Sequence, residues 1–485
     1  MDKRKYSYLI YNLFISAFTL ALIELFDLKE SYVFMFIYAL NSLLVFGLLA
    51  LEEINHFEGL NMRLLVLIGC FMRFVLPSIT KAWGSMNGEV YAFLRPENDI
   101  NDYMFPTVVW MNIYYSIFYL CFVRFSSSNS IEEKIKPFFK SKYITLLALF
   151  IFSIGIIYNV LVSFIPAALI PSFINTFAGN LATLGILIQL FQALFNPSRF
   201  NKRVFIIIII ISLFQTIAFG FYKGAIMINF VYYLLYYFLD CKYHKKKLIT
   251  PKLIIASILL FITIDAVIYP FMTTKRIVAG WDAGTGLASN SYSNIEILAD
   301  VLKGNSLSER GENTTASRLD AIEPNAFFYK ECCKRGLRTS IVAKNNIELL
   351  VPRFINKNKH DSEAGLMVYA YATTGSFENV DLALSNNYIG QFASAYLIGG
   401  PILAVLLAFI NGWFLMFYYN FLLKHMNNII AIILFIPLIL SALLAFEEIH
   451  DGGLLRMGYN IIMMFGLWLM TLFFPNFLTI KTKSV

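Results

Sequence analysis

The chain of 485 residues is 58% hydrophobic and only 14% charged, with a formal net charge of +8. Soluble domains carry roughly a quarter charged residues, so this composition excludes an ordinary water-soluble fold. Because the Lys and Arg residues lie mainly between apolar runs, where such residues set membrane topology, the positive charge does not indicate nucleic-acid binding.

Apolar runs long enough to cross a bilayer, which takes about 20 residues, recur along almost the whole chain. The sequence therefore predicts an all-α polytopic membrane protein with about 12 transmembrane helices. The basic start is followed by a run that lacks a small-residue cleavage site, which predicts a retained first helix. The predicted spans are 7–25, 31–51, 62–80, 105–123, 143–170, 174–195, 204–220, 222–239, 253–272, 388–419, 429–447 and 459–478.

The spacing of these runs divides the chain into three parts. Residues 1–272 hold the first nine predicted spans, and residues 388–485 hold the last three. Residues 273–387 form a long, partly helical loop, with a helical pattern at 317–335. Long loops of this kind are usually functional, so this loop is the expected place for a hydrophilic site.

The distribution of Lys and Arg predicts the orientation of the spans. Basic clusters at both termini and in the loops 124–142, 196–203 and 240–252 all fall on one side of a twelve-span count. Such loops are typically cytoplasmic, so the long loop is predicted on the opposite, periplasmic side. Loop 52–61 is the exception, because it has no Lys or Arg before Arg63.

The segment 350–365 of the long loop carries groups suited to phosphate chemistry. Arg353 and Lys357 offer the guanidinium and ammonium groups that hold a phosphate or diphosphate. His360, close by, could remove a proton from an attacking hydroxyl. A solvated charged loop is the alternative interpretation.

Four further residues on the same predicted side are candidates. Lys223 could contact substrate or snorkel at the interface, and Arg276 could do so or anchor a helix end. Arg318 could bind substrate or pair with Asp320 at the surface. Glu448, in the turn FEEIHDGG, could supply a carboxylate or lie in a solvated turn.

Charges within the spans, and the cysteines, complete the inventory. Glu24, Arg73 and Asp265 lie in apolar runs, where charges are costly, and Arg73 and Asp265 could pair or line a cavity. The five cysteines match no zinc spacing or disulfide framework, and the adjacent Cys332 and Cys333 are expected to be buried or idle. No nucleotide-binding or metal-binding motif is visible in the sequence.

The Pro-Arg-Phe element followed by Lys at 352–357, in a long external loop late in a many-span chain, resembles the repeat-unit polymerases of O-antigen and exopolysaccharide (the Wzy type). A glycine-rich helix start, here 390–409, also follows the element in that family. Many members have a Gly-Ser-Arg-Gly-like turn between two spans; the corresponding residues 221–224 have Lys in place of Arg.

The resemblance implies glycosyl transfer between two glycans carried on undecaprenyl diphosphate in a bacterial inner membrane. The acceptor hydroxyl attacks the anomeric carbon of the donor and the lipid diphosphate leaves, without metal or nucleotide. Membrane lipids and a chain-length regulator are the other implied partners. The implied roles are catalysis by Arg353, His360 and Glu448, and diphosphate or glycan binding by Lys223, Arg276, Lys357 and Arg318.

Three other functions fit parts of the pattern. An O-antigen ligase would share the chemistry and layout but would use a different acceptor. A lipid-linked glycan flippase would need a charged, water-filled path, for which three intramembrane charges are sparse. A sensor or assembly protein is the remaining class.

Overall fold

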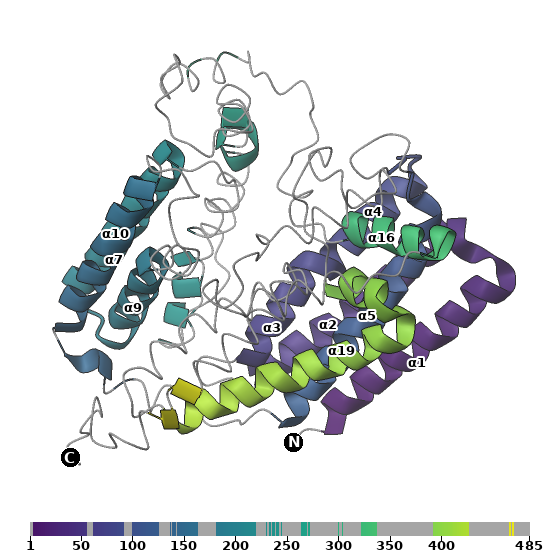
Figure 1. Ribbon diagram of the computed structural model, residues 1–485, viewed down its shortest axis with the longest axis horizontal. Helices are drawn as coiled ribbons and strands as arrows, with labels where there is room; N and C mark the ends of the chain where they lie inside the picture. The colour runs from purple at the N-terminus through teal and green to yellow at the C-terminus, as the bar shows by residue number, and fades with distance from the viewer. Residues whose placement is uncertain are drawn as a thin grey trace, which may run out of the picture. The chain divides into compact units, whose positions relative to one another are not determined.

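The computed structural model describes residues 3–55, 62–91, 99–125, 143–162, 181–219, 322–336 and 391–425, with shorter pieces such as 138–141 and 263–268 between them. Every element in these residues is a helix (Figure 1), as the sequence predicts. The chain divides into two units. Unit 1 comprises Met1–Phe57, Asn61–Asn129 and Leu319–Thr479, and unit 2 comprises chiefly Ser130–Arg318.

Five of the described helices are long and apolar enough to cross a membrane, which confirms five of the predicted spans. Two further predicted runs are also helical. They are α9 (Leu181–Phe195), which is shorter, and α10 (Arg199–Phe219), which begins with several charged residues. The predicted spans 222–239, 253–272, 429–447 and 459–478 lie partly or wholly outside the described residues, so the total of twelve stays a prediction. The five are α1 (Lys3–Phe26), α2 (Tyr32–Asn55), α5 (Asn101–Phe125), α7 (Tyr143–Val162) and α19 (Gln391–Lys424).

The predicted span 62–80 is helical but is not one regular α-helix. It consists of α3 (Met62–Cys70), a π-helical turn at Phe71–Val75 and α4 (Leu76–Met86). In the turn, the Leu76 N–H donates to the Phe71 carbonyl, five residues back. Pro77 lacks the N–H that would bond the Arg73 carbonyl in a regular helix, so α-helical bonding is already interrupted at this point.

Helix α19 is divided by a kink. If straight, its 34 residues would measure about 51 Å, against about 30 Å of hydrocarbon. Gly399 and Gly400 leave the helical conformation, and Gly400 has φ 71°, which glycine adopts at little cost. The kink separates a short piece at 391–398 from a spanning piece at 401–424 (Figure 1).

A buried polar network joins α1, α2 and α5. The Asn12 side-chain amide donates to Asn112 Oδ1 at 2.7 Å, and Asn112 Nδ2 donates to the hydroxyls of Tyr38 at 2.7 Å and Ser42 at 2.9 Å. Tyr38 also shares a 2.6 Å hydrogen bond with Ser16. Because hydrocarbon offers these groups no partner, mutual hydrogen bonding fixes how the three helices pack.

A buried ion pair closes one end of the same bundle. Lys5 Nζ lies 2.6 Å from Glu53 Oε1, and the two side chains are only 7% and 3% exposed. The Tyr119 hydroxyl donates to the same carboxylate oxygen at 3.5 Å. The start of α1 therefore lies beside the end of α2, at what we call the Lys5 end of unit 1.

In unit 2, the described ends of three loops predicted on the cytoplasmic side do lie together. Gln192 of α9, shortly before loop 196–203, donates through Nε2 to the carbonyl of Ser141 in loop 124–142, at 3.1 Å. Lys202 Nζ, in loop 196–203, lies 3.5 Å from Oδ1 of Asp240, the first residue of loop 240–252. These contacts join described residues at the ends of the three loops; the common side of the membrane that the basic residues indicate stays a prediction.

Replacing Glu53 by Ala should destabilise the protein by about 3–5 kcal/mol, because Lys5 would stay buried without its counter-ion. The thermal unfolding of the purified protein in detergent measures this. The double variant Lys5→Met/Glu53→Leu should recover most of the loss. Lys29→Ala is the control, because Lys29 and Asp27 form an exposed pair at 3.4 Å that should contribute little. Equal effects of Glu53→Ala and Lys29→Ala would contradict the prediction.

Candidate functional site

The seven residues predicted to act on substrate lie outside the described residues, so whether they converge stays a prediction. The structure does describe one helix of the long loop and the ends of the spans that hold it. These elements define where the loop is attached. The seven residues are Lys223, Arg276, Arg318, Arg353, Lys357, His360 and Glu448.

Helix α16 (Ile322–Arg335) confirms the helical pattern predicted in the long loop. Its 14 residues span about 21 Å and include five charged side chains, so it is no transmembrane span. Glu323 lies in its first turn, where a negative charge is favourable. Gly336, with φ 62°, follows its last residue in the left-handed conformation that commonly ends a helix.

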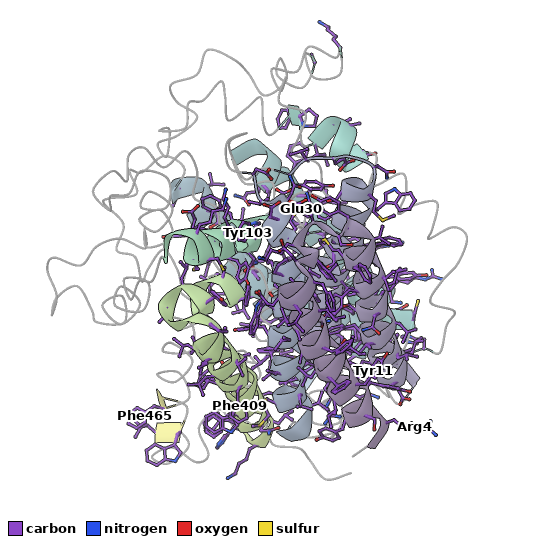
Figure 2. The ribbon with its side chains drawn as sticks, turned by 90° about the vertical axis from the view of Figure 1, so that its right-hand side faces the viewer. Arg4, Tyr11, Glu30, Tyr103, Phe409 and Phe465 are labelled. Atoms are coloured by element: carbon purple, nitrogen blue, oxygen red, sulfur yellow. The ribbon has the colours of Figure 1, made fainter. Side chains whose placement is uncertain are left out.

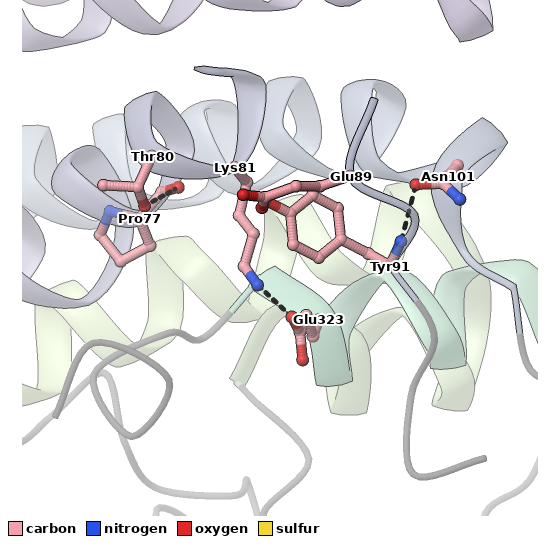
Figure 3. A network of polar contacts seen from close by, with 7 residues as sticks. All are labelled: Pro77, Thr80, Lys81, Glu89, Tyr91, Asn101 and Glu323. Carbon is pink, nitrogen blue, oxygen red and sulfur yellow. Dashed lines mark hydrogen bonds and ion pairs between the residues drawn. The ribbon is translucent and has the colours of Figure 1, made fainter. Parts of the chain in front are cut away.

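Three polar contacts tie α16 to other parts of unit 1. Glu323 pairs with Lys81 of α4 (Figure 3). Lys330 Nζ donates to the Asp99 carbonyl at 2.8 Å, directly before α5. Asn325 Oδ1 accepts from the Ala393 N–H at 2.9 Å, in the first turn of α19. We call the end of the bundle at which α16 lies the α16 end.

The surroundings of Lys81 are themselves ordered by hydrogen bonds (Figure 3). Lys81 Nζ lies 4.0 Å from the centroid of the Tyr91 ring, and the Tyr91 hydroxyl donates to Glu89. The Tyr91 N–H donates to Asn101 Oδ1 at 3.1 Å. A Cβ at Gly84 would collide with the ends of the Tyr91 and Glu89 side chains, which would have to shift. Glu89 and Tyr91, shortly after α4, are thus held beside the lysine that binds α16.

Aromatic rings fill the contact beneath α16. Tyr329 of α16 lies 5.0 Å from Tyr396, and Tyr396 lies 5.6 Å from Phe392, both in the short piece of α19. Burial raises the pKa of the Tyr329 phenol, so this group stays neutral. Lys334 Nζ lies 5.5 Å from the centroid of the Tyr103 ring, at the start of α5. These contacts seat α16 on two spans at once.

The two attachments fix the ends of the motif-bearing segment. Residues 337–390, which contain Arg353, begin directly after α16 and end directly before α19. Because Asn325 bonds Ala393 and the Tyr329 and Tyr396 rings are in contact, the two helices that flank the segment pack against each other. Whatever path the segment takes, it starts and finishes at the α16 end of unit 1.

The described part of the α16 end is rich in carboxylates, and most of its ammonium groups already have partners. Lys29 pairs with Asp27 at 3.4 Å, Lys81 pairs with Glu323, and Lys330 bonds a carbonyl. This part alone therefore offers little to hold a diphosphate. The described carboxylates at this end are Glu24, Asp27, Glu30, Glu89, Asp99, Asp102, Glu323 and Glu331.

The three charged residues predicted within the spans lie at different kinds of position. Glu24 is exposed and lies two residues before the end of α1. Arg73 and Asp265 each lie in a π-helical turn, Phe71–Val75 and Ile264–Ile268, and they belong to different units. Their side chains lie outside the described part, so their pairing stays a prediction. Single π-helical turns are frequent at functional sites, and sequence reasoning missed both.

The cysteines of α16 were partly foreseen, and the buried ion pair was not. Cys332 is buried as expected, whereas Cys333 is exposed on α16. The Lys5–Glu53 pair was not foreseen, although loop 52–61 gave a signal: it begins with two glutamates where a basic cluster was expected.

The chain matches no family model, no curated protein and no solved structure. Its function must therefore be inferred from the motif and from the anchored loop that carries it.

Lys81 and Glu323 should be energetically coupled. In a double-mutant cycle with Lys81→Ala and Glu323→Ala, measured as free energies of unfolding in detergent, we expect a coupling of about 1–2 kcal/mol. The pair is part-buried, with side chains 14% and 27% exposed, so solvent screens it only partly. A cycle between Glu323→Ala and Lys334→Ala is the control and should give almost none, because these residues lie at opposite ends of α16. Equal couplings in the two cycles would refute the anchoring role.

Proposed function

We propose that the protein is a lipid-carrier-dependent glycosyltransferase that polymerises the repeat units of a surface polysaccharide. Its donor and acceptor would be oligosaccharides linked to undecaprenyl diphosphate. The observation that carries this proposal is the attachment of residues 337–390, with the Pro-Arg-Phe element, to one end of a helical bundle at both of its own ends. That arrangement suits a soluble segment that covers the headgroups of lipids held beside the spans.

The α16 end would face the periplasm and the Lys5 end the cytoplasm. Arg4, Lys5 and Arg63 lie at the Lys5 end, and Lys424 closes α19 on that side, as the positive-inside rule favours. The carboxylate-rich α16 end fits the opposite face. Lipid-linked repeat units would then meet the motif on the side where polysaccharide is assembled.

In the proposed reaction, the acceptor hydroxyl attacks the anomeric carbon of the donor glycan, and the bond from that carbon to the diphosphate oxygen breaks. His360 would take the hydroxyl proton, with Glu448 as the alternative base. Negative charge grows on the leaving diphosphate, and preorganised cations are the strongest means of stabilising it. Arg353 is the first candidate, assisted by Lys357, with Lys223, Arg276 and Arg318 as further contacts.

The paired state of the described lysines supports this assignment to the motif. Lys29, Lys81 and Lys330 already bind protein oxygens and Lys334 lies over the Tyr103 ring, so a diphosphate at the α16 end would need cations from elsewhere. Between residues 352 and 360, basic side chains occur without any carboxylate. This short stretch is therefore the best-suited source of positive charge in the attached segment.

Arg353→Ala should abolish chain growth while the protein stays in the membrane. Loss of one charge-stabilising group typically costs a factor of about 10²–10³ in rate. Gel analysis of surface polysaccharide should therefore show single repeat units instead of long chains, and Arg353→Lys should restore part of the activity. Lys334→Ala, which removes an exposed cation from α16 in the same loop, should leave long chains intact.

Two outcomes would contradict this proposal, each in a different part. Normal long chains in Arg353→Ala cells would remove Arg353 from the mechanism. Long chains that accumulate on the lipid carrier, with none attached to the lipid A core, would instead identify an O-antigen ligase, because polymerisation would then be intact.

The orientation can be tested with native Cys333. It is exposed on α16, whereas Cys70, Cys121, Cys241 and Cys332 are buried. A membrane-impermeant maleimide should therefore label intact spheroplasts at Cys333, and Cys333→Ser should remove the signal. In the Cys333→Ser background, Lys424→Cys at the Lys5 end should react only after permeabilisation. The reverse pattern would place the loop in the cytoplasm and exclude the proposed reaction.

A further inference from the structure

A crevice opens on the surface of the α1–α2 hairpin, near the α16 end. Its volume is about 240 Å³, somewhat below the range of about 300–1,000 Å³ for small-molecule pockets. The one-turn helix η1 (Leu28–Glu30) connects α1 to α2, and Leu28 belongs to the crevice wall. The lining residues are Ile15, Thr19, Leu22, Ile23, Leu28, Phe34, Ile37, Tyr38, Asn41 and Phe105.

The lining of the crevice suits a hydrocarbon chain. Seven of its ten lining residues are aliphatic or Phe, and the polar ones are largely engaged: the Tyr38 hydroxyl bonds Ser16 and Asn112, and Thr19 Oγ1 donates to the Ile15 carbonyl at 2.8 Å. Phe34 and Ile37 are 50% and 57% exposed on helices apolar enough to span a membrane. A single lipid chain fits this chemistry, whereas a sugar would leave its hydroxyls without partners.

The charges beside the crevice would favour one kind of lipid headgroup. Glu24, Asp27 and Glu30 are exposed around the connection between α1 and α2, with Lys29 as the cation among them (Figure 2 labels Glu30). Lys29 is already paired with Asp27, and the carboxylates of Asp27 and Glu24 raise the pKa of its ammonium group. The connection is therefore net negative. It would attract an ammonium group and repel a phosphate without one.

We propose that this crevice binds one acyl chain of a phospholipid whose headgroup carries an ammonium group, such as phosphatidylethanolamine, with the headgroup beside Glu24, Asp27 and Glu30. The site is distinct from the proposed diphosphate site, because the same carboxylates would disfavour an undecaprenyl diphosphate at this place. The occupant is a membrane lipid bound to the outer surface of the hairpin, and the proposal does not depend on the polymerase reaction.

Competitive lipid binding tests the proposal. The full-length protein in detergent is incubated with equal amounts of phosphatidylethanolamine and phosphatidylglycerol of the same acyl chains, and with undecaprenyl phosphate, and bound lipid is read by native mass spectrometry. We expect about a fivefold preference for phosphatidylethanolamine over phosphatidylglycerol, which corresponds to about 1 kcal/mol. The triple variant Glu24→Gln/Asp27→Asn/Glu30→Gln should bring this ratio close to one.

Variants that fill the crevice isolate this site from other bound lipid. Ile37→Trp on α2 and Ile15→Trp on α1 fill it from opposite walls and should each remove one retained lipid. Leu44→Trp is the matched control: Leu44 is 58% exposed on α2, close to the 57% of Ile37, but does not line the crevice. Equal or better binding of phosphatidylglycerol or undecaprenyl phosphate would overturn the proposal. So would equal losses in Leu44→Trp and both filling variants.

Discussion

Hydrocarbon offers no hydrogen-bond partner, and the rest of unit 1 depends on how its buried polar groups meet that constraint. Apolar packing alone discriminates poorly between arrangements of helices in lipid, because lipid tails are as apolar as leucine. The amide of Asn112 bonds Tyr38 and Ser42 of α2, and Asn12 of α1 bonds Asn112 in turn. Any sliding of one helix would break several of these bonds at once. The Lys5–Glu53 pair applies the same constraint at the end of the bundle.

Once the spans are fixed in register, their ends place the attachment points of the loop. Lys81, the Asp99 carbonyl and the Ala393 N–H come from three different elements, and α16 contacts all three. A helix of 14 residues is marginal on its own in water. Its stability therefore depends on these contacts and on the ring packing of Tyr329. The bundle thus holds in place the last described helix before residues 337–390.

Hydropathy and charge predicted the parts of this fold that depend on composition. The spans at α1, α2, α5, α7 and α19 are where the apolar runs indicated. The π-helical turn before Pro77 and the pairing of Lys5 with Glu53 depend on particular neighbours, so periodicity could not reveal them. Glu53 also clarifies the one loop that broke the basic pattern, because it supplies the counter-charge for Lys5. The residues proposed to act on substrate lie outside the described part and stay predictions from the motif.

The distribution of charge links the two proposed lipid sites. Carboxylates dominate the described α16 end, and three of its lysines are occupied by protein oxygens. A polyanionic lipid that reached this end would be repelled from the α1–α2 connection, where Glu24, Asp27 and Glu30 favour an ammonium headgroup. It would be attracted only where cations occur without carboxylates, as between residues 352 and 360. Repulsion at one place and attraction at another would direct a diphosphate to the anchored segment more selectively than attraction alone, because specificity is a difference between binding free energies.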